Sequence, residues 1–227
     1  MNKKYQGVVV PMVTPITPAG AVDLFAANRI VEHLLQGGVD GVFALGTTGE
    51  GASVPQAEAL RLVKSVVQQV GERALVYAGV NNNCIFDAAT TGNQYLSAGA
   101  DALVLLPPSY FPLQPSELFY SIKQLLDRLE GPAFLYNIPA TTHHSIPLDI
   151  IEKLLGHPRL VGLKDSENDA QRLEKLVSRF SECPTFSLFI GVGMHMATML
   201  SLGADGIVPS VGNLVPEICT KLTKAIR

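Results

Sequence analysis

Short apolar runs alternate with longer amphipathic stretches along the whole chain. The runs are rich in Val, Ile and Leu at successive positions, which is typical of strands that are covered on both faces. Eight runs are predicted to be strands: Gly7–Pro15, Gly41–Thr48, Ala74–Val80, Ala102–Pro108, Ala133–Pro139, Leu160–Asp165, Ser187–Val192 and Gly206–Gly212. The stretches between them are long enough for helices.

Several of these intervening stretches carry helix signals. Leu24–Leu35 repeats apolar residues with a period of about 3.6. Prolines open other helical patterns, because proline fits the first turn of a helix. These patterns cover Gln56–Val70, Ser116–Leu129, Leu148–Leu155 and a last stretch that runs from Val215-Pro216 to the end of the chain.

The number of units favours one fold class. Eight strand–helix units in 227 residues average about 28 residues each, close to the minimum for a βαβ unit. Doubly wound sheets commonly use five or six strands, whereas eight repeats favour closure into a (β/α)8 barrel. No linker, low-complexity tract or shift in composition divides the chain. We therefore expect residues 1–227 to form a single barrel domain.

Composition and charge narrow the function classes. Hydrophobic residues make up 47% of the chain and charged residues only 16%, and the net charge is -3. Nothing here indicates a nucleic acid or an anionic membrane as partner. The three cysteines are far apart and form no Cys-x-x-Cys, which argues for a reducing compartment and against structural zinc. Because no apolar run approaches a membrane span, we expect a cytoplasmic protein.

Lys164 is the strongest candidate for chemistry. It ends an apolar run too short for a helix, so a strand would bury its stem and partly desolvate its amine. A neutral lysine amine forms Schiff bases with carbonyl compounds. Tyr136 ends the preceding predicted strand, which would place a phenol beside the amine. Strand alternation would send Asp165 to the opposite face. The alternative is a lysine whose amine simply reaches water at the end of a strand.

Two further strand ends carry unusual residues. The second predicted strand ends in Gly46-Thr47-Thr48-Gly49-Glu50-Gly51, whose hydroxyls and backbone N–H groups could hold a carboxylate or a phosphate. A glycine turn with threonines as local caps is the alternative. The fourth strand ends in a stiff loop, Pro107-Pro108-Ser109-Tyr110-Phe111-Pro112, suited to a lid or a subunit contact. In a barrel of this class the working residues lie at such strand ends.

Other catalytic classes find little support. The five histidines show no metal-ligand spacing and no His-Glu-x-x-His, which argues against a metal-dependent aldolase or a zinc hydrolase. No Gly-x-Ser-x-Gly elbow indicates a serine hydrolase.

The ordered strand-end motifs resemble those of a known family over essentially the whole chain. The motifs are Gly46-Thr47-Thr48-Gly49-Glu50, Tyr110, Tyr136-Asn137-Ile138-Pro139, Gly162-Leu163-Lys164-Asp165 and Gly203-Ala204-Asp205-Gly206-Ile207-Val208. They resemble the dihydrodipicolinate synthase / N-acetylneuraminate lyase superfamily of pyruvate-dependent class I aldolases. The resemblance implies reversible carbon–carbon bond chemistry on a 2-keto acid, without a metal or organic cofactor.

The resemblance also implies roles for individual residues. Lys164 would form the covalent imine with pyruvate, and Tyr136 would pass protons to and from the substrate. Thr47 would join Tyr136 in a hydroxyl relay with Tyr110, which usually reaches in from a neighbouring subunit of a homodimer or homotetramer. The remaining residues would bind the substrate: Thr48 and the turn at Gly46 hold its carboxylate, and Val208 lines the site.

Departures from the family pattern bear on substrate. Dihydrodipicolinate synthases usually carry an arginine two residues after the proline of the Tyr-Asn-x-Pro motif, where this chain has Thr141. Sialic acid lyases carry acidic residues where it has Gly193 and Met194. The motifs are nearer to those of 2-keto-3-deoxy sugar acid aldolases. Dihydrodipicolinate synthase itself and a non-catalytic 2-keto acid-binding protein remain as alternatives.

The end of the chain also differs from the family pattern. Family members usually continue past the eighth barrel helix into further helices, whereas this chain stops at Arg227. We therefore expect a barrel without the usual C-terminal helical extension.

Overall fold

The predicted strands close into one parallel barrel, in a computed structural model that describes residues 3–226. Each strand pairs with the next along the chain, and β1 pairs with β8. The strands are β1 Gly7–Pro11, β2 Gly41–Ala44, β3 Leu75–Val80, β4 Ala102–Leu105, β5 Ala133–Asn137, β6 Leu160–Asp165, β7 Ser187–Ile190 and β8 Gly206–Ile207. The predicted (β/α)8 fold is confirmed.

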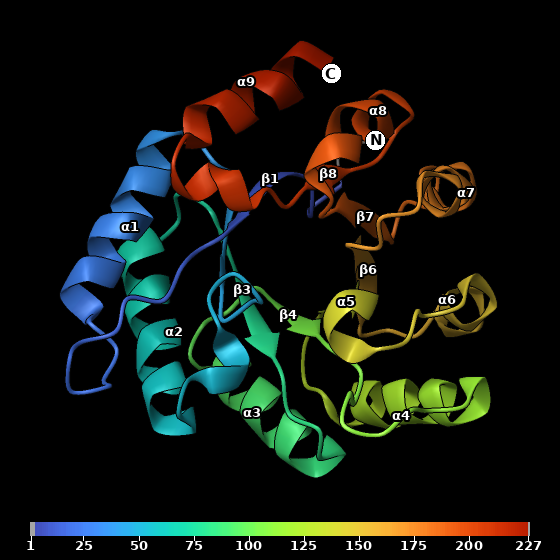
Figure 1. Cartoon of the computed structure of the whole chain (residues 1–227), viewed down its shortest axis with the longest axis horizontal. Coiled ribbons are helices and arrows are strands. Elements are labelled where there is room, and N and C mark those ends of the chain that lie inside the picture. Colours follow the sequence, from blue (N-terminus) through green and yellow to red (C-terminus); the bar gives the residue numbers. More distant parts are fainter. Residues whose placement is uncertain (1–2, 227) are drawn as a thin grey trace.

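Helices surround the barrel (Figure 1). Their bounds are α1 Leu24–Gln36, α2 Gln56–Val70, α3 Ile85–Ser97, α4 Pro115–Arg128, α5 Pro139–Thr142, α6 Leu148–Leu154, α7 Ala170–Phe180, α8 Met196–Ser201 and α9 Pro216–Ile226. The helix over Gln56–Val70 has the predicted bounds, and the other predicted helices differ by one residue at one end or at both ends. The last predicted helix extended to Arg227, which lies outside the described residues. No helix between residues 3 and 226 is long and apolar enough to cross a membrane.

Two apolar clusters form the core. The larger one lies between the strands and the helices, and the smaller one fills the barrel. Inside the barrel, the ring of Phe134 lies 5.7 Å from that of Tyr77 and 5.2 Å from that of Phe189, measured between centroids. A barrel of this size is filled by side chains. The open space for chemistry is therefore left at the C-terminal ends of the strands.

Most strands end earlier than their apolar runs predicted. The predicted Gly41–Thr48 stops at Ala44, because Leu45 takes a left-handed backbone conformation with φ 60°. The predicted Gly206–Gly212 keeps only two residues as strand, and the predicted Gly7–Pro15 ends at Pro11. Residues beyond these ends form the βα loops. The polar residues that follow β2 and β8 consequently lie in loops, whereas Tyr136 and Lys164 remain at the ends of β5 and β6.

Candidate active site

Lys164 and Tyr136 lie side by side at the ends of β6 and β5. Their Cα atoms are partners in the parallel register of the two strands, as the sequence predicted. Both side chains are buried, with 5% of Lys164 and 2% of Tyr136 exposed. The Nζ atom of Lys164 lies 3.5 Å from the centroid of the Tyr136 ring and 5.1 Å from that of Phe43. The amine is thus enclosed by aromatic rings.

This enclosure shifts the pKa of both groups. Burial disfavours the ammonium form and lowers the pKa of Lys164, although Tyr136 partly opposes the shift. Burial alone would raise the pKa of the Tyr136 phenol, but the charge and hydrogen bond of Lys164, together with hydrogen bonds from Thr47 and Ser166, outweigh it, and the pKa of Tyr136 is lowered. A proton can therefore be exchanged between the two groups more readily than between a free lysine and a free phenol.

Asp165 gives Lys164 no ion pair. Its carboxylate points away from the barrel interior, as strand alternation predicts, and bonds at 2.9 Å with both Nε and Nη2 of Arg172 on α7. The nearest acid in sequence is therefore neutralised by another cation, which leaves the Lys164 amine free to lose its proton.

A turn with a strained backbone at Leu45 positions Thr47 and Thr48. Leu45 is buried in the left-handed region at φ 60°, a conformation that costs about 1–2 kcal/mol in a residue with a β-carbon. Its carbonyl accepts a bond of 3.0 Å from Nδ2 of Asn81. A β-carbon at Gly51 or Gly79 would lie within 2.2 Å of that same oxygen. Two glycines and an asparagine thus hold the turn that begins at Gly46.

Thr47 joins this turn to the tyrosine. Its Oγ1 donates to the phenol oxygen of Tyr136 at 3.4 Å. Within residues 3–226, the amides of Thr47 and Thr48 donate to no other protein group, which leaves them for a carboxylate. The amides of Glu50 and Gly51 bond to carbonyls inside the turn and are not available to a ligand. The Oγ1 of Thr48 lies 3.1 Å from Oγ of Ser210, just beyond β8.

The last two predicted site residues differ, because Val208 is buried and Tyr110 is exposed. Val208 follows β8 and is buried in the same apolar cluster as Tyr136. Tyr110 is 77% exposed, and its ring packs edge-on against Phe111, with 4.8 Å between centroids. In the described part of the chain no contact joins Tyr110 to Thr47 or Tyr136. A single copy therefore brings together the predicted residues other than Tyr110.

A cleft of about 200 Å³ opens beside Gly46 and Thr47. Its wall includes Thr47, Thr141 and small polar residues from the loops after β3 and β4, namely Asn81 and Ser109. The charged residue in the wall is Glu50, and no lysine or arginine contributes to it within residues 3–226. No group of three histidine, cysteine or acidic side chains in that range could hold a metal ion.

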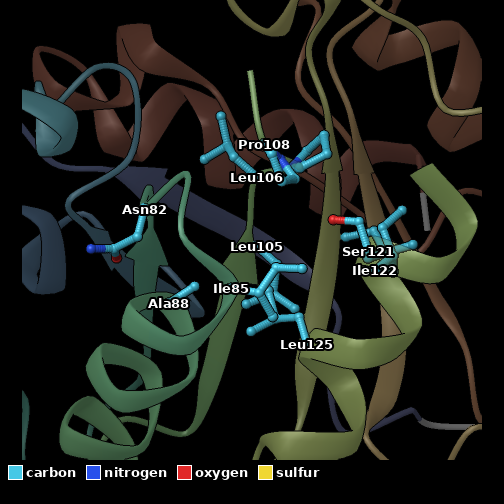
Figure 2. A pocket seen from close by; sticks show the side chains of 11 residues that line it. Asn82, Ile85, Ala88, Leu105, Leu106, Pro108, Ser121, Ile122 and Leu125 are labelled. Carbon is cyan, nitrogen blue, oxygen red and sulfur yellow. The ribbon is translucent and has the colours of Figure 1, made fainter. Parts of the chain in front are cut away.

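A separate cavity lies behind the loop that carries Tyr110 (Figure 2). Apolar side chains from α3, β4 and α4 line it, including Ile85, Leu105 and Ile122, and Pro107 and Pro108 border it. Its volume of about 10 Å³ is that of a single water molecule, and its lining offers few polar partners. We interpret this cavity as a small packing gap beneath the loop and not as a ligand site.

Some polar residues around the site escaped the sequence analysis. Ser210, which meets Thr48, and Arg172, which pairs with Asp165, belong to no motif that we singled out. Arg172 follows the helix-capping Asp169 by three residues, and that spacing predicts only a helix start. Ser210 and Thr48 are far apart in sequence, and Arg172 meets Asp165 across the loop between β6 and α7, so local patterns carried no signal for these contacts.

Comparisons with known proteins agree with this geometry. The family model described as the dihydrodipicolinate synthetase family matches residues 4–227. A 4-hydroxy-tetrahydrodipicolinate synthase of Streptomyces coelicolor is 34% identical over 91% of this chain and 67% of its own length. A probable 2-dehydro-3-deoxy-D-pentonate aldolase of Escherichia coli is 28% identical over 99% and 75%. The crystal structure of the Escherichia coli prophage protein YagE with pyruvate superposes with a TM-score of 0.91, at 26% identity over 97% and 75%.

A closed (β/α)8 barrel that places a buried lysine beside a tyrosine at adjacent strand ends suits imine chemistry on a carbonyl compound. The chain belongs to the dihydrodipicolinate synthetase family. It is a carbon–carbon lyase of the pyruvate-dependent class I type.

Proposed function

We propose that this lyase reversibly cleaves a 2-keto-3-deoxy sugar acid into pyruvate and an aldehyde, through an imine on Lys164. The observation that carries the proposal is the buried Lys164 amine, which lies 3.5 Å from the ring centroid of Tyr136 and, within residues 3–226, forms no ion pair with a carboxylate. A non-catalytic binder of 2-keto acids would need neither the desolvated amine nor the phenol beside it.

The proposed first stage is imine formation. The neutral Lys164 amine attacks the keto carbon of the substrate, and the carbinolamine then loses its hydroxyl as water. Tyr136 is placed to protonate that departing hydroxyl, and Thr47 is within reach of the Tyr136 phenol. The unpaired amides of Thr47 and Thr48 are suited to hold the carboxylate, with the Thr48 hydroxyl beside them and Val208 against the apolar side.

The proposed second stage breaks the bond between C3 and C4. Tyr136, as phenolate, accepts the proton of the C4 hydroxyl, and the C4 carbon leaves as an aldehyde. The electron pair of the broken bond passes into the imine and gives an enamine. Protonation of the enamine and hydrolysis then release pyruvate and restore Lys164. The imine is itself the electron sink, so the mechanism draws on no metal or organic cofactor.

The cleft supports a neutral, hydroxylated aldehyde as the other product. Asn81, Ser109 and Thr141 offer uncharged hydrogen-bonding groups, and among the described residues no lysine or arginine of the wall could pair with a second carboxylate. One relative bears the name of a probable 2-dehydro-3-deoxy-D-pentonate aldolase. A panel of 2-keto-3-deoxy acids of different chain lengths, assayed for pyruvate release, tests the proposal. Release from none of them would refute it.

The second candidate is the synthase reaction after which another relative is named, 4-hydroxy-tetrahydrodipicolinate synthesis. Condensation of pyruvate with aspartate semialdehyde should be weak or absent in the unmodified chain, because Thr141 cannot pair with the carboxylate of that aldehyde. Thr141→Arg should increase the rate with aspartate semialdehyde, since a guanidinium there can form a bidentate pair. Thr141→Gln, which is long but uncharged, is the control. Rapid turnover of the semialdehyde by the unmodified chain would instead favour the synthase.

We also propose that the site is completed by a second copy of the chain. Tyr110 is exposed on a proline-stiffened loop and lies apart from Thr47 and Tyr136 in a single copy. In a homodimer or homotetramer, an isologous contact would let each copy donate Tyr110 to the other. The activity per subunit should then fall when the protein is diluted into monomers. Constant activity down to a monomer verified by light scattering would contradict a shared site.

We place the protein in the cytoplasm. The reducing conditions there suit its three free cysteines, Cys84, Cys183 and Cys219. Its proposed partners are the small 2-keto acid and further copies of itself, and neither nucleic acid nor membrane enters the mechanism.

A further inference from the structure

A buried polar network lies on the outer side of β6, directly behind Lys164. The Asp165 carboxylate is fully buried, and Arg172 is 8% exposed. Besides the two bonds from Arg172, Asp165 accepts one from Nδ2 of Asn137 and one from the backbone amide of Glu167, both at 2.9 Å. The charges of this pair are therefore compensated on several sides, as a buried ion pair requires.

The network joins the two ends of residues 138–147, a stretch called here the α5 segment. Asn137 precedes the segment, and its Oδ1 accepts a bond of 2.8 Å from the backbone amide of Ile146 near the other end. The Nη2 atom of Arg172 donates at 2.9 Å to the Ile146 carbonyl. Ser145 donates to Glu167 at 2.5 Å, and Glu167 also accepts from Asn137. One guanidinium thus ties the end of the α5 segment to the last residue of β6.

The α5 segment borders the reacting groups. Ile138 packs in the apolar cluster that contains Tyr136 and Val208, and Thr141 lines the cleft together with Thr47. Lys164 is held independently, because β6 pairs with β5 and β7 on either side of it. The proposed pyruvate carboxylate site lies in the loops after β2 and β8, and the hydrogen bonds of Arg172 go instead to Asp165, Ile146 and Asp169. Arg172 therefore positions the segment that contributes Thr141 to the cleft, and it does not hold Lys164.

We infer that Arg172 is a positioning residue for the aldehyde half of the reaction. It holds the α5 segment, and Thr141 with it, against the cleft through its bonds to Asp165 and Ile146. This inference rests on the proposed function, since the aldehyde half exists only in a lyase of this kind. Arg172 itself is not expected to contact the substrate.

The test compares three variants in two assays. Arg172→Lys keeps the positive charge but cannot reproduce the fork that reaches Asp165 and Ile146 together. Ser145→Ala removes one bond to the α5 segment and leaves the buried pair intact, so it still tests the inference if Arg172→Lys fails to fold. Arg179→Met is the matched control, because Arg179 lies on the same helix and pairs with Glu152 at the outer surface.

The first assay traps the pyruvate imine with borohydride, and the second measures kcat and KM for cleavage of the best substrate from the panel. We expect Arg172→Lys to lower kcat/KM for cleavage by about 10 to 100-fold, mainly through KM, because displacement of a positioning segment has effects of this size. The rate of imine trapping should be unchanged. Ser145→Ala should lower kcat/KM for cleavage by a smaller factor and leave the rate of imine trapping unchanged. Arg179→Met should change neither kcat/KM nor the rate of imine trapping.

Two results would overturn the inference. Imine trapping and cleavage could fall together in both Arg172→Lys and Ser145→Ala, which would assign the network a general structural role. Alternatively, cleavage could stay unchanged in a folded Arg172→Lys protein. Failure of the unmodified protein to trap pyruvate is a separate outcome, since it would refute the proposed function itself.

Discussion

Lys164→Arg is expected to abolish turnover. A guanidinium stays protonated at every pH at which the protein is folded, so it can neither attack a keto carbon nor form an imine. The change retains the positive charge and most of the side-chain volume. Loss of activity would therefore report the missing nucleophile, provided that circular dichroism shows a folded protein. Pyruvate release from the best substrate of the panel is the measurement.

The control for this variant is Lys175→Arg, on the exposed face of α7. It should retain full activity. The pH dependence of the unmodified protein offers an independent check, because burial lowers the pKa of Lys164. The rate of imine formation should rise with pH as the ammonium form is lost and reach half its maximum below pH 10.5, the ordinary pKa of lysine. An active Lys164→Arg protein would contradict the assigned nucleophile.

Tyr136→Phe is expected to lower kcat by about 10²–10⁴-fold, the usual effect of losing a general acid or base. The ring that packs over Lys164 is retained, whereas the hydroxyl that exchanges protons is removed. Imine formation should slow without vanishing, because water can supply protons less efficiently. Steady-state kinetics of cleavage and the rate of imine trapping would both be measured.

Two further variants serve as a comparison and a control for Tyr136→Phe. Thr47→Val should have a smaller effect than Tyr136→Phe, since Thr47 bonds to the phenol at 3.4 Å and acts through it. Tyr120→Phe, at an exposed position on α4, is the matched control and should change neither kcat nor the rate of imine trapping. Unchanged turnover in Tyr136→Phe would show that Tyr136 serves only to pack the interior of the barrel.

The fold could be predicted because a parallel barrel leaves a strong signal in the sequence. Strands that are buried on both faces are apolar at consecutive positions, and helices outside them carry one apolar stripe. Strand ends were predicted less well, since an apolar residue continues a run whatever its backbone does. Leu45 is apolar and buried, yet its left-handed backbone ends β2.

For some of the helices expected between the strands, no bounds were predicted. The α3 helix begins after Cys84 with no side-chain cap and contains Gly92, so no range was predicted for it. No range was predicted for the strongly amphipathic α7 either, although Asp169 caps its first turn.

The site was predictable where one residue type at a strand end carries the chemistry. Lys164 and Tyr136 stood at the ends of successive apolar runs, and parallel pairing made them neighbours. The contacts of Arg172 and Ser210 depend instead on register and loop path across the barrel. Tyr110 was predictable as a loop residue, but a single chain does not bring it to the site.

Reduction of the protein with borohydride in the presence of pyruvate tests the central claim most directly. If Lys164 forms the imine, peptide mass spectrometry will find one reduced pyruvate adduct, on the peptide that contains Lys164, and the Lys164→Arg protein will carry none. An adduct on a different lysine, or no adduct in protein that is active, would contradict the assignment of Lys164 as the Schiff-base residue.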